Sequence, residues 1–510
     1  MSEANPQLPT VTPDPVPPVG PLQMDEVRID PLLALRVPAN LAVRREMLPF
    51  VQWRGKVYVA CVDLRDAASL GAVQRAFELP IEPVLADSES LRRALARIYG
   101  SLKPGAGGTA AIGKPTGRAS EAEVIDGAGL SDELLYSAIL RQASDIHIDP
   151  GPETLRIRFR VDGGLEEIQR LPMTVAGNLA NRFKVLAQMD ISEKRAPQDG
   201  AFRHSYGDNR TLDIRAATLP TKWGERLTLR LLGLQTGVLT LERLGMDASH
   251  LKLFEAALAQ PHGMILLTGP TGSGKSTTLY AGIRRLLDLE ALNIITVEDP
   301  VEYDIHGVAQ VTVDSADKTS FAGALRSILR HDPDVVMIGE IRDGETADIA
   351  VKASLTGHLV FSSLHTNTAA GAVTRLGDMG VERYLIASTL RLSIAQRLVR
   401  KLCSRCRQPG VLTVGEATAL GRPDAEGRTT FSKGGCLYCG GKGTVGRLAI
   451  FEFLPLDETW SQTVNRGAQE VEILEEMKKR GLPLLLDDAL HKLGGGVTTF
   501  EEVRNAVAAW

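Results

Sequence analysis

The chain has 510 residues, of which 44% are hydrophobic and 24% charged, so its length and composition describe roughly three ordinary globular domains. The net charge of -4 and the pI near 6.2 give no general basic field, which disfavours nucleic acid as the main partner. No apolar run approaches the roughly 18 residues of a spanning helix, and the start of the chain lacks an export signal, so we expect a cytoplasmic protein that meets a membrane only through a partner.

Residues 1–25 carry seven prolines and few apolar residues, and we expect a disordered tail that cannot bury enough surface to fold. Residues 26–100 have the pattern of a small α/β domain without a visible catalytic residue. Cys61 lies in an apolar run and is predicted to be a buried, inert thiol. The elements expected in this domain are strands at 57–62 and 82–85 and helices at 67–77 and 88–99.

Residues 101–120 contain five glycines and two prolines, which predicts a flexible linker. Residues 121–234 are predicted to form a second α/β domain. In the run 155–161 arginines alternate with apolar residues, so three arginines share one face of a strand. That cationic face is either a solvated surface or a contact for nucleotide phosphate or an acidic neighbouring subunit. His147 is predicted to be a structural strand histidine.

A nucleotide-binding stretch follows a connector at 235–245. The apolar run 264–268 leads directly into Gly-Pro-Thr-Gly-Ser-Gly-Lys-Ser at 269–276, which is the spacing of a P-loop. Its glycines let successive N–H groups point at phosphate oxygens, and the helix that follows adds its N-terminal dipole. Lys275 is predicted to reach the outer phosphates and Ser276 to ligate magnesium. The predicted nucleotide-binding residues are Gly269, Pro270, Thr271, Gly272, Ser273, Gly274, Lys275, Ser276 and Thr277.

Three further apolar runs in this part of the chain lead into a polar, reactive side chain: Glu298, Glu340 and His365. Continuous apolar strands interleaved with helices indicate a parallel sheet that is covered on both faces. In such a sheet ligands bind beyond the carboxyl ends of the strands. We therefore expect Glu298, Glu340 and His365 to converge over Lys275 as catalytic residues.

The two acids are both candidates for holding magnesium and for orienting the attacking water. We favour Glu298 for the water and Glu340 for the magnesium, and the sequence leaves the order open. Asp334 begins the strand that Glu340 follows, and six residues of strand separate the two by about 20 Å. Asp334 is therefore expected to cap or pair at the opposite edge of the sheet.

Four of the five cysteines form two Cys-x-x-Cys pairs, Cys403 with Cys406 and Cys436 with Cys439. In a chain expected to stay in the cytosol this pattern favours a metal over disulfides. Four thiolates suit a closed tetrahedral zinc site, which folds its loop and performs no chemistry. The 29 residues between the pairs exceed the commonest zinc-ribbon spacing, so a redox or metal-free role is the alternative.

The end of the chain is predicted to be helical, with 471–477 as an amphipathic piece and no recognisable site. The predicted organisation is a tail at 1–25, a first domain at 26–100, a linker at 101–120, a second domain at 121–234, a connector at 235–245, an ATPase core at 246–400, a tetracysteine subdomain at 401–446 and a helical subdomain at 447–510.

Together these motifs resemble those of type II secretion ATPases, within the wider family of type II secretion and type IV pilus assembly ATPases. The resemblance covers nearly everything after the proline-rich tail and rests on five motifs in the family's order. These are Walker A at 269–276, the aspartate box at 296–302, an atypical Walker B from 329–334 through 339–343, the histidine box at 355–358 and 364–367, and the tetracysteine insertion.

The resemblance implies an α/β protein with a RecA-like P-loop ATPase domain, preceded by small α/β domains, that uses ATP, Mg²⁺ and Zn²⁺. It implies a hexameric cytoplasmic motor that docks through its N-terminal domain on inner-membrane platform proteins. It also implies that arginines of the second domain reach the nucleotide, and Arg215 matches one such position. Where relatives often have arginine after Asp-Gly this chain has Ala201, and Arg203 is the candidate substitute. Thr368 stands where an acidic residue is common.

We therefore expect a motor that drives pseudopilus assembly and protein export across the outer membrane. The nearest alternative is a type IV pilus extension ATPase, although the short first domain without a preceding helical module favours secretion. A nucleic-acid translocase built on the same core is a rival of another class, and an aromatic content of 5% offers little for it. A non-hydrolysing, nucleotide-gated scaffold is the third alternative.

Overall fold

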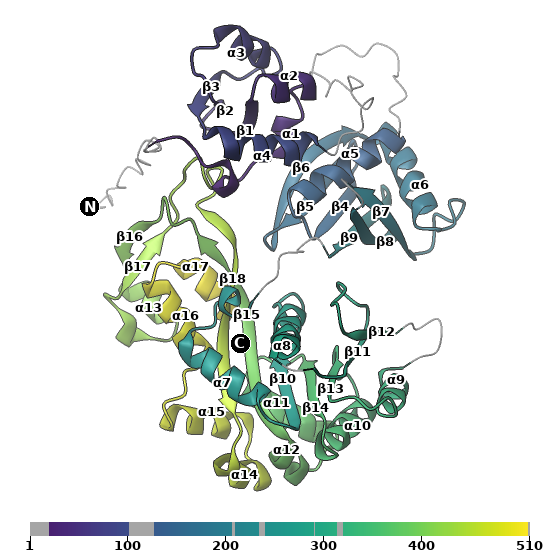
Figure 1. The fold of residues 1–510 in the computed structure, drawn as a ribbon, viewed down its shortest axis with the longest axis vertical. Helices are drawn as coiled ribbons and strands as arrows, with labels where there is room; N and C mark the ends of the chain where they lie inside the picture. The colour runs from purple at the N-terminus through teal and green to yellow at the C-terminus, as the bar shows by residue number, and fades with distance from the viewer. Residues whose placement is uncertain are drawn as a thin grey trace, which may run out of the picture. The chain divides into compact units, whose positions relative to one another are not determined.

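The computed structural model describes residues 20–100, 127–206, 210–233, 240–289, 291–313 and 320–507 (Figure 1). The predicted linker and residues 1–19 of the predicted tail lie outside these ranges. The chain divides into two compact units. Unit 1 comprises Met1–Thr236, Cys403–Gln408 and Lys433–Val445, and unit 2 comprises Gly237–Leu402, Pro409–Ser432 and Gly446–Trp510.

The first domain of unit 1 is a three-stranded sheet covered by short helices. Strand β2 lies between β1, to which it is antiparallel, and β3, to which it is parallel. The predicted strands and helices are present, whereas the sequence did not point to β1 or to the short helices α1 and α2. The elements are η1 (Met24–Glu26), α1 (Pro31–Ala34), α2 (Ala39–Arg44), β1 (Met47–Trp53), β2 (Lys56–Cys61), α3 (Ala67–Gln74), β3 (Ile81–Leu85) and α4 (Ser88–Tyr99).

The predicted boundary of the tail at residue 25 is wrong for residues 20–25. Leu22 and Met24 are fully buried in the core of the first domain, and the Leu22 N–H donates to the Leu85 carbonyl at 2.9 Å. The apolar side chains that follow the last proline therefore belong to the fold. Cys61 is also fully buried, and burial raises its pKa to about 11, as expected for an inert thiol.

The second domain of unit 1 is a six-stranded antiparallel sheet in the order β6-β5-β4-β9-β8-β7, with α5 and α6 packed into its apolar core. The predicted alternation is confirmed in β5, where the apolar side chains are buried and the arginines are more exposed. The elements are α5 (Gly127–Leu140), β4 (Asp145–Pro150), β5 (Thr154–Val161), β6 (Gly164–Pro172), η2 (Met173–Val175), α6 (Ala176–Leu186), β7 (Gln198–Tyr206), β8 (Arg210–Thr221) and β9 (Gly224–Leu232).

Unit 2 is built on a seven-stranded sheet in the order β12-β11-β13-β14-β10-β15-β18. The pairs from β12 through β15 are parallel, and separate apolar clusters cover the two faces, which confirms the predicted doubly covered sheet. The elements up to β15 are η3 (Glu242–Leu244), α7 (Ala248–Leu258), β10 (Gly263–Thr268), α8 (Lys275–Leu289), β11 (Ile294–Glu298), β12 (Ala309–Thr312), α9 (Phe321–Ile328), β13 (Val335–Ile338), α10 (Gly344–Leu355), β14 (Leu359–Leu364), α11 (Ala370–Asp378), α12 (Arg383–Thr389) and β15 (Leu390–Leu402).

The prediction of a wholly helical segment after residue 446 is wrong at its start, because β18 joins the sheet beside β15. Residues 449–454 of β18 are buried on both faces, and so short an apolar run does not separate strand from helix. Residues 409–432 also group with unit 2, whereas they were predicted to belong to the cysteine subdomain. The remaining elements are β16 (Gln408–Val411), α13 (Val414–Ala419), η4 (Pro423–Ala425), β17 (Thr429–Ser432), β18 (Thr444–Pro455), α14 (Glu458–Asn465), α15 (Glu470–Lys479), α16 (Leu485–Gly494) and α17 (Phe500–Val507).

The helices of the described part of the chain do not have the length and apolar character that a membrane crossing requires.

Candidate nucleotide site and metal centre

The P-loop connects the fully buried strand β10 to helix α8. Gly269, Gly272 and Gly274 have φ angles of 149°, 79° and 88°, which L side chains rarely adopt. Space also demands glycine, because a Cβ on Gly269 would lie 2.6 Å from the Gln396 carbonyl oxygen, and one on Gly274 would lie 2.9 Å from Gln396 Nε2. The loop is therefore fixed by its own backbone and by its contact with β15.

Lys275 is buried at the start of α8. Its ammonium donates to the carbonyl oxygens of Gly269 at 2.7 Å and Pro270 at 3.2 Å. Burial lowers its pKa from the usual 10.5 to about 8; the negative charge of Glu340 opposes this shift and the positive charge of Arg397 adds to it. Lys275 is thus a partly desolvated cation whose charge a phosphate would stabilise.

Glu340 and His365 meet at the carboxyl ends of β13 and β14. His365 Nε2 lies 2.9 Å from Glu340 Oε2, and the guanidinium of Arg342 pairs with the other carboxylate oxygen. Burial alone would raise the pKa of Glu340, but the hydrogen bonds from His365 and Arg342 outweigh it and hold the pKa below its usual value. Glu340 is therefore an ionised carboxylate within electrostatic range of Lys275.

Glu298 ends β11 and is only 3% exposed. Its carboxylate accepts hydrogen bonds from Thr296 Oγ1 at 2.7 Å, from Gln310 Nε2 at 3.1 Å and from the Tyr280 hydroxyl. Burial, together with the negative charge of Glu298, raises the pKa of Tyr280, which stays a donor. To orient a water Glu298 would first have to exchange one of these partners, whereas Glu340 is half-buried.

Two residues of β15 at this site were missed by sequence analysis. Gln396 accepts from Thr278 Oγ1 at 2.8 Å and donates to the Ser273 carbonyl at 2.9 Å, so it fastens the P-loop from the neighbouring strand. Arg397 is 5% exposed and donates to both oxygens of Asn367 at 3.1 Å. The only signal in the sequence is a polar pair in the middle of an apolar strand.

Asp334 lies at the other end of β13, as predicted, where its carboxylate accepts the Asn293 N–H at 2.7 Å. It pairs at the far edge of the sheet.

Arg215 lies on the exposed side of β8 in the second domain, directly opposite Ala201 of β7. Arg203, two residues along β7, is paired with Asp213 at 2.8 Å. The position without an arginine and the retained Arg215 are therefore cross-strand neighbours on the same sheet.

The cationic face of the second domain carries its own acids. Two aspartates of β4 each bridge an arginine of β5 to an arginine of β9. The pairs are Asp145 with Arg230 (3.0 Å) and Arg160 (3.7 Å), and Asp149 with Arg158 (2.7 Å) and Arg226 (2.9 Å). His147 lies between the aspartates, and burial lowers its pKa, which supports the structural role predicted for it. The face is therefore a network of ion pairs in which arginines outnumber aspartates.

The four cysteines of the two pairs come together as predicted. Their sulfur atoms all lie within 4.8 Å of one another, and three of the separations are 3.8 Å. A tetrahedral zinc with bonds of about 2.3 Å to sulfur has S–S edges of about 3.8 Å. The cluster therefore fits a closed zinc site.

Asp247, His250 and Asp488 form the other group with metal-ligand chemistry among the described residues. The Lys492 ammonium already donates to Asp488 at 2.6 Å, so a side-chain cation takes the place of a metal there.

The model of the Type II/IV secretion system protein family matches residues 121–505, and that of the MshEN domain matches residues 18–105. The chain belongs to the Type II/IV secretion system protein family. Members of this family at 41% to 48% identity include the type II secretion system protein E of Dickeya dadantii (48%, over 73% of this chain and 74% of the relative) and that of Pseudomonas aeruginosa (41%, over 92% and 95%). The type IV pilus assembly ATPase PilB of Myxococcus xanthus is 38% identical over 94% of this chain and 88% of its own.

Two solved structures share the fold. The Legionella pneumophila ATPase DotB superimposes with a TM-score of 0.54 at 23% identity, covering 77% of this chain and 98% of its own. The pilus retraction motor PilT with bound ADP gives a TM-score of 0.50 at 26% identity, covering 76% and 97%. The secretion-ATPase family membership identifies this protein as an ATPase and supports the predicted α/β P-loop architecture.

Proposed function

We propose that this protein is the ATP-hydrolysing motor of a type II secretion system, which drives pseudopilus assembly and so protein export across the outer membrane. The observation that carries the proposal is the ionised Glu340, held by His365 and Arg342 within electrostatic range of the P-loop lysine. The secretion role is supported by the near end-to-end likeness to the P. aeruginosa protein E.

In hydrolysis, the side chains at the carboxyl ends of the parallel strands would have separate roles. Lys275 would leave its loop carbonyls and neutralise the outer phosphates of ATP. Ser276, exposed at the start of α8, and Glu340 would hold Mg²⁺, which supplies further charge neutralisation when bound. His365 keeps Glu340 oriented, and Glu298 would position the attacking water after leaving its internal hydrogen bonds.

The second domain would complete the site with Arg215, whose exposed guanidinium is suited to a phosphate. We propose that the chain acts as a hexamer, in which a moving domain or a second copy completes the site, so isolated chains should turn over slowly. We propose that the oligomer is cytoplasmic and peripheral at the inner membrane, held there by platform proteins.

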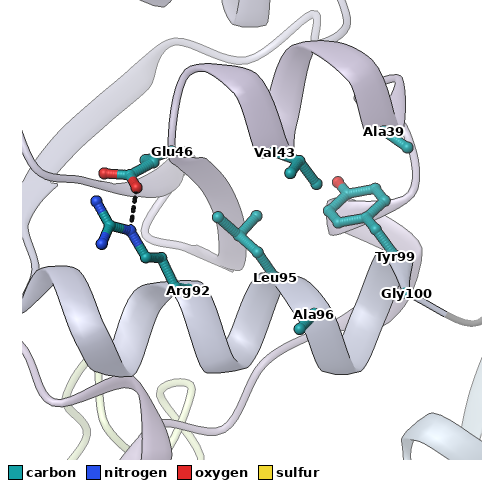
Figure 2. A pocket seen from close by; sticks show the side chains of 8 residues that line it. All are labelled: Ala39, Val43, Glu46, Arg92, Leu95, Ala96, Tyr99 and Gly100. Atoms are coloured by element: carbon teal, nitrogen blue, oxygen red, sulfur yellow. Dashed lines mark hydrogen bonds and ion pairs between the residues drawn. The ribbon is translucent and has the colours of Figure 1, made fainter.

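The first domain offers a surface for such a platform partner. A pocket of about 490 Å³ lies between α2 and α4, and Figure 2 shows the Glu46–Arg92 ion pair at one end, Val43 and Leu95 in the middle and Tyr99 at the other end. Val43 is 50% exposed, so an apolar segment flanked by charge would gain by covering it.

The variant Lys275→Ala tests the proposal. We expect phosphate release from ATP to fall at least about a hundredfold, because the phosphates lose their main cation, while circular dichroism stays unchanged. Lys352→Ala, which removes a surface lysine paired with Asp348, is the matched control and should retain full activity. Undiminished ATP turnover by Lys275→Ala would contradict this mechanism.

A type IV pilus extension motor is the second candidate, favoured by the likeness to PilB over 94% of the chain. Expression in bacteria that lack either the secretion ATPase or the pilus extension ATPase separates the two. Restored protein export without restored pili supports the secretion role, and the reverse result supports the pilus role.

A further inference from the structure

The two parts of the chain that carry the metal ligands pack against the first domain within unit 1. We call Cys403–Gln408 and Lys433–Val445 the cysteine segments. Leu437, between two of the ligands, is 7% exposed and belongs to the same apolar cluster as the core of the first domain. The backbone carbonyl of the next residue, Tyr438, accepts a hydrogen bond from the Arg28 N–H at 2.8 Å. A side chain and a backbone group of the cysteine segments are therefore part of the first domain's own fold.

Glycines of the cysteine segments make room for the end of β1. A Cβ on Gly441 would lie 2.6 Å from Trp53 Cδ1, and one on Gly435 would lie 3.2 Å from Trp53 Cζ2. Gly441 also has φ +77°, so both space and backbone require glycine there. The indole thus rests directly on the backbone of the ligand loop.

Charged groups extend the contact on both sides. Arg405, between the other two ligands, pairs with Glu26 of the first domain and lies 4.5 Å above the Tyr438 ring. Lys442 pairs with Glu166 of the second domain, which also faces Arg28 at 3.5 Å. The cysteine segments thus contact both N-terminal domains.

We propose that the tetracysteine module is the docking site of the first domain, and that the metal held by its four thiolates sets the shape of that site. The docking residues lie between the ligands or directly after them: Arg405, Leu437, Tyr438, Gly440 and Gly441. A metal that fixes four sulfurs also fixes the short loops between them. The first domain also pairs directly with the second domain, as Asp30 does with Arg141, so metal occupancy controls how tightly the first domain is held. This inference does not depend on ATP hydrolysis.

The test uses the full-length protein with a protease recognition site inserted at residue 110. After cleavage of the zinc-loaded protein, we expect the N-terminal piece to co-elute with the remainder in gel filtration. Removal of zinc by a chelator should release the piece, and added zinc should restore binding. Release from zinc-loaded protein, or unchanged retention after zinc removal, would overturn the proposal.

The variant Leu437→Asp separates docking from metal binding. It should keep the zinc content of the wild type, measured by mass spectrometry, while affinity for the N-terminal piece falls roughly a hundredfold. Val445→Asp makes the same kind of change at a residue that is 41% exposed, and should leave the affinity unchanged. If Leu437→Asp fails to fold, Trp53→Ala serves instead, with hydrogen exchange in β1 as readout. Equal retention by Trp53→Ala and wild type would contradict the inference.

Discussion

The two large sheets of the protein present their polar side chains in different ways. In the parallel sheet of unit 2 both faces are buried, so Lys275, Glu340 and His365 gather where strands end. In the antiparallel sheet of the second domain one face packs on α5 and α6, and the other displays rows of arginine and aspartate. The parallel sheet therefore concentrates its charged groups at one edge, whereas the antiparallel sheet spreads them over a face. Loss of a single charged group should reduce ATP hydrolysis far more at that edge than on that face.

The variant Glu340→Gln should show the largest effect of those that follow. It removes the charge that is proposed to hold Mg²⁺ and that His365 and Arg342 stabilise, so we expect kcat to fall a hundred- to a thousandfold. The measurement is steady-state phosphate release. Glu345→Gln, which removes an exposed acid paired with Arg326, is the control and should stay near wild type. A modest fall in kcat for Glu340→Gln would contradict the expectation that the edge of the parallel sheet is more sensitive than the face of the antiparallel sheet.

The variant Arg215→Ala tests whether the arginine-bearing face of the second domain contacts nucleotide. A single charge-assisted contact to phosphate predicts about a tenfold fall in kcat/KM. Arg170→Ala, at an exposed arginine paired with Glu167, is the control and should be neutral. Ala201→Arg places a second arginine opposite Arg215 and should raise ATP affinity, because both would face the same ligand. If neither variant changed kcat/KM or ATP affinity, the face would be a solvated surface that does not contact nucleotide.

The pH dependence of ATP binding tests the environment of Lys275. Its pKa is about 8 in the free protein, below the usual 10.5, and bound phosphate would raise it. Binding should then take up a proton above pH 8, and affinity should fall about fivefold between pH 8 and pH 9. Calorimetry in two buffers of different ionisation enthalpy measures this uptake. Lys275→Arg, which keeps its proton, should show none.

The variant Tyr280→Phe should have the smallest effect. It removes one donor from Glu298, so if Glu298 must leave its network to orient water, kcat should rise two- to threefold. Tyr303→Phe is the control, since the Tyr303 ring stacks edge-on against Tyr280. A lower rate for Tyr280→Phe alone would assign Glu298 a purely structural role and leave the water to Glu340.

What the sequence predicts well here is whatever depends on local spacing. The P-loop, the acids and histidine at strand ends and the two cysteine pairs are each encoded in a few consecutive residues. Glu298 shows the limit, because its Tyr280 partner comes from another element, and Gln396 reaches the P-loop from a strand more than a hundred residues away. β18 and the buried Leu22 were missed for the same reason: their neighbours, not their own pattern, decide their structure.

Strand β15 joins two regions through continuous backbone. It carries Gln396, which is hydrogen-bonded to the P-loop, and it ends at Leu402, immediately before the first of the four clustered cysteines. Six residues of extended chain span about 20 Å, and a strand flanked by β10 and β18 stretches very little. Any shift that a nucleotide imposed on Gln396 would therefore displace the far end of β15 at Leu402 by a nearly equal distance.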